Sequence, residues 1–251
     1  MREREGLLVA ERWRAHSPAL AELGAGLMVL AVLIEGLLLW LAAPDGLRLS
    51  ALAVYLSMAA LVLWAWPSAR RRLGWANRVT LLRGMLVAIL AGAVIFPDFM
   101  ARHAFDMAIL AVLALMLDGL DGWVARLTRS ASAFGARFDM ELDAFFILVL
   151  CAALVAVDKV GVWVLAIGAM RYVFVLAGYG WPWLARALPQ SRRRKAICVW
   201  QVVSLMLGLL PVMAGSLASL LAVLALGLLA LSFGLDVRWL ARRHASRPTS
   251  A

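Results

Sequence analysis

Four aspartates interrupt a chain that is otherwise strongly apolar. The segment that holds them reads DGLDGWVARLTRSASAFGARFDMELD; it begins with Asp118 and Asp121 and ends with Asp139 and Asp143. The first pair is three residues apart and the second pair is four apart, so each pair falls on one face of its helix. Glycine and serine residues between the pairs allow the chain to reverse direction. We therefore predict two antiparallel helices that bring all four carboxylates together.

Carboxylates inside or beside membrane spans are costly, and four of them in one pocket repel one another. The spans hold no equal set of lysines that could compensate them. A bound divalent cation would remove the repulsion, and hard oxygen ligands favour Mg²⁺, Mn²⁺ or Ca²⁺ over zinc. The sequence therefore predicts a metal site built from carboxylates.

Small residues and an arginine follow the first aspartate pair. Gly122 and Ala125 remove side-chain bulk, which lets a phosphorylated ligand approach the backbone. Arg126 can meet a phosphate with two parallel hydrogen bonds. Beside a metal, these features indicate a pyrophosphate site. The alternative is a helix hairpin whose acids form salt bridges with Arg126, Arg129 and Arg137, which accounts for the charge balance but not for the one-face spacing.

The pattern from Asp121 to Asp143, D-G-x2-A-R-x8-G-x3-D-x3-D, resembles the signature of the CDP-alcohol phosphatidyltransferase family at every defined position. Asp118 matches a further family aspartate. The resemblance implies that Asp118, Asp121 and Asp139 hold metal. It implies that Asp143 is both a neighbour of the metal and the general base. It also implies contacts with the CDP moiety by four residues of the signature: Gly122, Ala125, Arg126 and Gly135.

A second segment, Asn77-Arg-Val-Thr80-Leu-Leu-Arg83, resembles the stretch that opens the first helix of the family, with Ala76 in place of the family's proline. By this resemblance, Asn77 and Thr80 contact the nucleotide. The implied reaction uses Mg²⁺ or Mn²⁺, with two ions at the pyrophosphate. Asp143 takes the proton of an alcohol, the alcohol attacks the phosphorus that bears the lipid of CDP-diacylglycerol, and CMP leaves.

Basic residues further along the chain bear on the acceptor alcohol. Arg171 stands within an apolar run, where a buried arginine favours an anion. Arg193 and Arg194 open the next run, and an ordinary positive anchor explains them equally well. Related enzymes use basic residues in this region when the acceptor carries phosphate. We therefore predict a phosphatidylglycerophosphate synthase-like enzyme that takes glycerol 3-phosphate, with phosphatidylglycerol (giving cardiolipin), an inositol phosphate and serine as alternative acceptors.

The composition places these residues in a membrane protein. The 251 residues are 65% hydrophobic and 16% charged, whereas soluble domains are about 45–50% apolar and about 25% charged. Eight apolar runs approach or reach the length of a membrane-spanning helix. They are Leu20–Ala43, Leu49–Trp66, Val79–Phe96, Phe105–Leu117, Leu142–Val157, Val160–Gly178, Ala196–Ala214 and Leu217–Leu235.

We predict an all-α polytopic membrane protein in which a six-helix family core follows two additional N-terminal transmembrane helices. The core is the CDP-alcohol phosphatidyltransferase domain. The predicted divisions are a cytoplasmic N-terminal segment (1–19), the two additional helices (20–66), an interfacial segment (67–76), the core (77–243) and a polar tail (244–251).

Arginine-rich loops alternate along the chain with loops that carry few positive charges. The positive-inside rule then predicts that the basic loops, both termini and the active site face the cytoplasm. The N-terminus shows no cleavable signal peptide, which fits a bacterial inner membrane. Glu35 is an acid inside the first apolar run, and either a function or simple pairing would account for it.

Other classes of protein fit the sequence less well. A net charge of +10 is compatible with nucleic-acid binding, but basic clusters between apolar runs favour anionic lipid headgroups, so we expect no nucleic-acid partner. A membrane transporter would spread its charges along a pathway, and an inactive scaffold would not need all four aspartates. The expected partners are CDP-diacylglycerol, an alcohol acceptor and membrane lipids. Relatives often form homodimers, although no residue here identifies a dimer.

Overall fold

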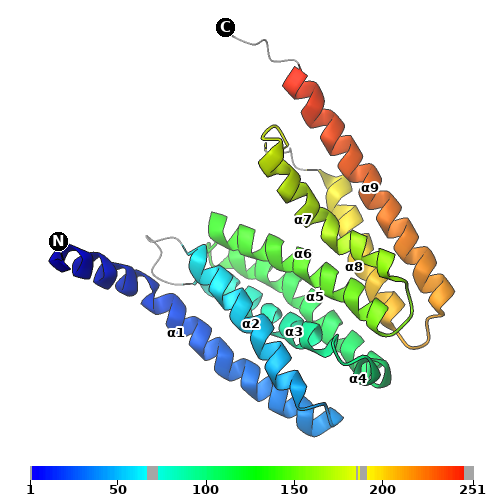
Figure 1. Ribbon diagram of the computed structural model, residues 1–251, viewed down its shortest axis with the longest axis horizontal. Helices are drawn as coiled ribbons and strands as arrows, with labels where there is room; N and C mark the ends of the chain where they lie inside the picture. Colours follow the sequence, from blue (N-terminus) through cyan, green and yellow to red (C-terminus); the bar gives the residue numbers. More distant parts are fainter. Residues whose placement is uncertain (1, 67–72, 185, 187–190, 246–251) are drawn as a thin grey trace. The chain divides into compact units, whose positions relative to one another are not determined.

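The computed structural model describes residues 2–66, 73–184, 186 and 191–245, with side chains described from residue 18 to residue 243 within those ranges. The described residues form helices and no strands (Figure 1). The predicted all-α fold is therefore confirmed. Most of the predicted interfacial segment (67–72) and of the polar tail (246–251) lies outside the described residues.

The chain divides into two compact units, Met1–Asp143 and Ala144–Ala251. The helices of the first unit are α1 (Arg2–Leu41), α2 (Gly46–Trp64), α3 (Trp75–Ala93), α4 (Pro97–Arg102), α5 (Ala104–Leu127) and the beginning of α6 (Ala133–Ala156). Those of the second unit are the rest of α6, the short 3₁₀ helix η1 (Val162–Val164), α7 (Leu165–Gly180), α8 (Arg192–Leu209) and α9 (Gly215–Ala245).

Six helical stretches in the described part of the chain are long and apolar enough to cross a membrane. They are Pro18–Leu41, Gly46–Trp64, Trp75–Ala93, Ala104–Leu127, Val162–Gly180 and Gly215–Arg243. Helices α6 and α8 form where the other two apolar runs predict them, but their first turns carry Asp139, Glu141 and Asp143, and Arg192 to Lys195. These charges shorten the apolar part of each helix. The chain is an integral membrane protein.

Helix α3 is the central helix of the first unit. In its apolar stretch 78% of the residues are buried, compared with 28% or less in the other five candidate spans. Helices α1 and α2 lie side by side along it (Figure 1), and their apolar side chains form one buried cluster with those of α3. The sequence predicted the two additional helices but not that they would enclose α3.

The contact between α2 and α3 is close. A Cβ at Gly92 of α3 would lie 2.7 Å from the backbone nitrogen of Ala51 in α2, and one at Gly84 would lie 2.6 Å from the sulfur of Met58. The Ser50 hydroxyl also donates to the carbonyl of Gly92 at 3.0 Å. A larger residue at Gly92 would push the two helices apart, whereas one at Gly84 would displace the end of the Met58 side chain.

The intramembrane acid of the first apolar run has a structural partner. Glu35 of α1 accepts two hydrogen bonds from Arg48 of α2, at 2.7 Å and 2.9 Å, and Asp45 joins the same guanidinium at 2.9 Å. The pair ties the ends of the two helices together across their short connection. Of the two explanations that the sequence allowed for Glu35, the structure shows the pairing.

The second unit has its own close packing. A Cβ at Gly168 of α7 would lie 2.5 Å from the Cα of Leu148 in α6. The Lys159 ammonium donates to the carbonyl of Leu210, which links the turn after α6 to the end of α8. These contacts hold the helices of this unit together.

Candidate metal and phosphate site

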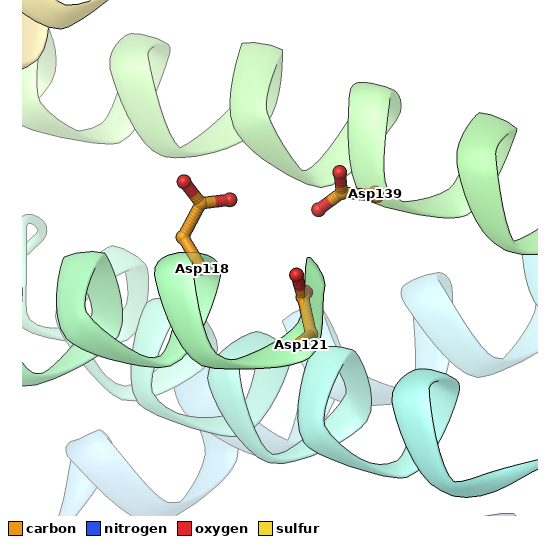
Figure 2. Close-up of side chains that lie close together, drawn as sticks. All are labelled: Asp118, Asp121 and Asp139. Carbon is orange, nitrogen blue, oxygen red and sulfur yellow. The ribbon is translucent and has the colours of Figure 1, made fainter. Parts of the chain in front are cut away.

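The four aspartates come from the last turns of α5 and the first turns of α6. Figure 2 shows Asp118 and Asp121 on α5 and Asp139 on α6, with their carboxylates turned toward one another. One oxygen from each of these three residues lies within 4.8 Å of the others. The prediction that helical spacing brings the two pairs together is confirmed.

Local sequence explains how the chain reverses between α5 and α6. Arg129 adopts a left-handed backbone with φ 50°, and the amide of Ser130 donates to the carbonyl of Ala125 at 3.1 Å. This is the hydrogen bond of a Schellman helix end, although an arginine stands where glycine is usual. Ser132 then caps the N-terminus of α6, because its hydroxyl accepts a hydrogen bond from the backbone amide of Gly135 at 3.0 Å.

Arg83 of α3 lies at the centre of the cluster and contacts all four acids. Its Nη1 is 2.5 Å from Asp118 Oδ1, 2.8 Å from Asp139 Oδ1 and 3.8 Å from Asp121 Oδ2. Its Nη2 donates to Asp143 Oδ1. The Arg83 side chain is 0% exposed, whereas Asp118, Asp139 and Asp143 keep 36–38% of theirs exposed. The four carboxylates therefore share one buried cation, and three of them remain partly exposed while Asp121 is buried.

Sequence reasoning gave Arg83 no role, although it is the last residue of the second family-like segment. It did not recognise that α3 would pack against α5. The signal was its spacing: Asn77, Thr80 and Arg83 recur every three residues and so lie along one side of α3. That side faces α5 and α6.

Thr80 and Asn77 both support the acidic cluster from within. The Thr80 hydroxyl is buried and donates to Asp121 Oδ2 at 2.9 Å. The buried Asn77 donates through Nδ2 to the carbonyl of Leu73 at 2.6 Å, while its Oδ1 lies against Gly135 of α6. The two residues predicted to touch the nucleotide thus also contact the helices beside α3: Thr80 bonds to α5 and Asn77 packs against α6.

Gly135 is a point of close approach between α3 and α6. A Cβ at this position would overlap Asn77 Oδ1 and would lie 3.1 Å from the hydroxyl of Ser132. A side chain at this position would therefore have to displace Asn77. Gly122 is different, since the nearest atom to its Cβ position is Arg126 Nη1, at 3.5 Å. The half-buried Gly122 and Ala125 and the exposed Arg126 continue along α5 beyond the aspartates.

The donor set fits a hard divalent cation. Four carboxylates carry four negative charges and Arg83 supplies one positive charge, so the cluster keeps a negative excess. Asp118, Asp121 and Asp139 offer oxygens at mutual distances within 4.8 Å. Clustered carboxylate oxygens suit Mg²⁺ or Mn²⁺. The salt bridges predicted by the alternative hypothesis form with Arg83 and not with Arg126, Arg129 or Arg137 in the part of the chain that the structure describes.

The three basic residues predicted to bind the acceptor lie in the second unit. Arg171 is half-buried in α7. Arg193 and Arg194, at the start of α8, form ion pairs with Asp236 of α9 at 2.6 Å and 3.4 Å. Sequence reasoning missed Asp236, which directly follows the last apolar run. These two arginines therefore already have an anionic partner within the protein.

The CDP-alcohol phosphatidyltransferase family model matches residues 73–233, which is well over half of the chain and includes all of the residues of the acidic cluster. No curated protein and no solved structure matches the chain. Members of the matched family use divalent metal ions to transfer a substituted phosphate group from a CDP-alcohol in phospholipid synthesis. The chain belongs to the CDP-alcohol phosphatidyltransferase family and is a membrane-embedded transferase.

Proposed function

We propose that the protein transfers the phosphatidyl group of CDP-diacylglycerol to glycerol 3-phosphate, forming phosphatidylglycerophosphate and CMP. The observation that carries this proposal is the gathering of Asp118, Asp121, Asp139 and Asp143 around Arg83. Arg83 and the first two aspartates stand on α3 and α5, which have the length and composition of membrane spans.

Asp118, Asp121 and Asp139 are the residues that would hold metal, with Mg²⁺ or Mn²⁺ as the ions and two ions as the expected number. Bound divalent metal would neutralise the pyrophosphate and the charge that develops on the departing phosphate. Thr80 keeps Asp121 oriented through its hydroxyl, and Arg83 keeps Asp118 and Asp139 together. These contacts fix the ligands before the substrate arrives.

Asp143 is the proposed general base. Its Oδ1 accepts from Arg83, which orients the carboxylate and leaves Oδ2 as the atom that would take the proton. The acceptor hydroxyl oxygen forms a bond to the phosphorus that bears diacylglycerol. The bond from this phosphorus to the oxygen bridging it to the CMP phosphate breaks, and CMP leaves with that oxygen and the bonding electrons. The hydroxyl proton passes to Asp143.

The donor substrate has a polar and an apolar end, and α5 offers surfaces for both. Gly122 directly follows Asp121, and Ala125 and Arg126 lie about one turn further along α5. Small residues and a guanidinium in these positions suit the CDP phosphates. Leu120 and Trp123 are exposed on the same helix. A lipid-facing apolar surface beside a phosphate site lets the acyl chains of the donor remain in the bilayer.

Arg171 supports an acceptor that carries a phosphate, because an arginine within an apolar span favours an anionic partner. Arg193 and Arg194 give weaker support, since Asp236 already neutralises them in part. Phosphatidylglycerol, an inositol phosphate and serine are the alternative acceptors. We also propose that the active site and both termini face the cytoplasm of a bacterial inner membrane, following the distribution of basic loops.

The test is CMP release from CDP-diacylglycerol by the purified protein with Mg²⁺ or Mn²⁺ and each acceptor in turn. We expect glycerol 3-phosphate to give the fastest release. Asp143→Asn should abolish it, whereas Asp98→Asn, at an exposed site in α4, should leave it unchanged. Faster release with another acceptor would replace glycerol 3-phosphate in the proposal. Failure of every acceptor would contradict phosphatidyl transfer from this donor.

A further inference from the structure

Helix α3 carries the residues that organise the acidic cluster, yet its own sequence does little to fix where it begins. The residue before it, Gly74, has φ 85° and gives no side-chain cap, and the first turn of α3 contains no acidic residue. The first amides of a helix lack partners within the helix and attract negative charge. An anchor for this end must come from elsewhere in the fold.

Glu22 of α1 provides that anchor. Its Oε1 accepts the backbone amide of Leu73 at 3.3 Å, directly before the start of α3. Its two oxygens also accept from Arg78, at 2.8 Å from Nε and 3.2 Å from Nη2. The Glu22 side chain is only 16% exposed, and Arg78 lies over the ring of Trp75 at 4.6 Å. One carboxylate thus binds both the chain entering α3 and a side chain of its first turn.

The anchored turn leads directly into the site. Asn77 follows Leu73 by one helical turn, and Thr80 and Arg83 follow at intervals of three residues. A helix is stiff over so short a distance, so displacement of its first turn displaces these side chains. Thr80 would then lose its 2.9 Å contact with Asp121, and Arg83 would lose its position among the carboxylates.

The side of α3 that faces away from the acidic cluster packs tightly against α1 and α2. A Cβ at Gly26 of α1 would overlap the Tyr55 hydroxyl and lie 2.8 Å from the end of Met85 in α3. The Tyr55 hydroxyl in turn donates to the carbonyl of Leu23 at 2.6 Å, one residue after Glu22. The two N-terminal helices therefore pack along α3, and Glu22 of α1 binds the start of α3 through hydrogen bonds and an ion pair.

We propose that Glu22 is a positioning residue for the acidic cluster: through Leu73 and Arg78 it sets the start of α3, and thereby Arg83 and Thr80, so that the two additional N-terminal helices serve the active site. The role in catalysis rests on the proposed function, while the role in metal binding does not.

The experiment compares Glu22→Ala, Glu22→Gln and Arg78→Ala with the unmodified full-length protein. Glu35→Ala is the matched control, because Glu35 lies on the same helix and also pairs with an arginine, but on α2 rather than α3. Mn²⁺ affinity, measured by electron paramagnetic resonance, reports the cluster directly. CMP release at varied metal concentration reports catalysis, and thermal unfolding reports the fold.

We expect Glu22→Ala and Arg78→Ala to weaken Mn²⁺ binding about tenfold, in the range known for residues that orient metal ligands. Glu22→Gln, which keeps an acceptor for Leu73 but loses the charge, should have a smaller effect. Glu35→Ala should lower thermal stability to a similar extent with unchanged Mn²⁺ affinity. The double variant of Glu22 and Arg78 should bind Mn²⁺ no more weakly than Glu22→Ala.

Unchanged Mn²⁺ affinity in folded Glu22→Ala and Glu22→Gln would overturn the inference, as would an equal loss in Glu35→Ala. If no variant or unmodified protein releases CMP, the proposed reaction fails, but the Mn²⁺ titration still decides the role of Glu22. If Glu22→Ala does not fold, Glu22→Gln and Arg78→Ala provide the same comparison.

Discussion

A single guanidinium, that of Arg83, contacts all four carboxylates of the candidate site and offsets only part of their negative charge. Arg83 is fully buried, so removal of its charge would leave the aspartates crowded without a fixed counter-ion. Its Nη1 contacts both Asp118 on α5 and Asp139 on α6, and its Nη2 contacts Asp143 on α6. Arg83 therefore links α3 to α5 and α6 at the point where the metal-binding carboxylates must lie close together.

Replacement of Arg83 tests this role. Breaking a buried ion pair by removing one partner costs about 3–5 kcal/mol, so Arg83→Met should lower thermal stability and bring CMP release close to background. Arg83→Lys keeps the charge but cannot reach several carboxylates with a planar fork, and it should retain partial activity. The measurements are thermal unfolding and CMP release. Full activity in Arg83→Met would contradict the role.

Thr80→Val tests the orientation of one metal ligand with little change in volume. The variant removes the hydroxyl that donates to Asp121. A hydrogen bond to a charged group contributes about 1.5–3 kcal/mol, so we expect Mn²⁺ affinity to fall by about tenfold or more. Thr80→Ser, which keeps the hydroxyl, is the control and should bind Mn²⁺ nearly as well as the unmodified protein. Equal affinities for valine and serine would argue against the contact.

The sequence spacing of the aspartates was enough to predict their grouping, because helical periodicity alone places both members of a pair on one face. Arg83 and Asp236 could not be assigned in the same way. Their contacts join residues that are at least 35 positions apart in the sequence, and a single sequence does not reveal which residues of different helices meet.

The helices around the site approach one another closely at glycine residues. Gly135 lets α6 approach the start of α3 so closely that Asn77 Oδ1 occupies the place of a Cβ. The sequence predicted Gly135 as a contact of the CDP moiety, on the strength of its place in the signature. The structure adds a packing reason for glycine here, because a Cβ would displace the Asn77 side chain.

Gly135→Ala should destabilise the protein by about 1–3 kcal/mol, because it overpacks the contact between α3 and α6. Gly119→Ala is the control in α5, since nothing lies within 4 Å of its Cβ position, and it should be neutral or stabilising by up to about 1 kcal/mol. Asn77→Ala combined with Gly135→Ala should recover most of the loss. Thermal unfolding of the detergent-solubilised variants measures all three. Equal stability of the two alanine variants would refute the packing requirement.

Across the whole molecule, the pattern of apolar and charged residues predicted where the helices lie. It did not predict which helices are surrounded by protein and which by lipid. All eight apolar runs are helical, yet α6 and α8 begin with charged turns that shorten their apolar parts. The same pattern gave no hint that α3 would be mostly buried by its neighbours, because burial by protein and burial by lipid select the same apolar residues.

The proposed topology can be tested with single cysteines at exposed positions. In a background with Cys151 and Cys198 replaced by alanine, a cysteine at Asp98 should react with an impermeant thiol reagent added to intact cells. One at Arg129, in the turn between α5 and α6, should react only after the membrane is opened. Both positions are exposed, and basic loops remain inside. The reverse pattern would place the acidic cluster on the outer side.

The most direct test of the whole account measures Mn²⁺ binding and CMP release on the same preparations of unmodified protein, Asp121→Asn and Asp143→Asn. The unmodified protein should bind Mn²⁺ and release CMP only when metal is present. Asp121→Asn should lose both properties, whereas Asp143→Asn should lose CMP release more completely than Mn²⁺ binding. Unmodified Mn²⁺ affinity and metal-dependent CMP release in Asp121→Asn would contradict the claim that this cluster is the catalytic metal site.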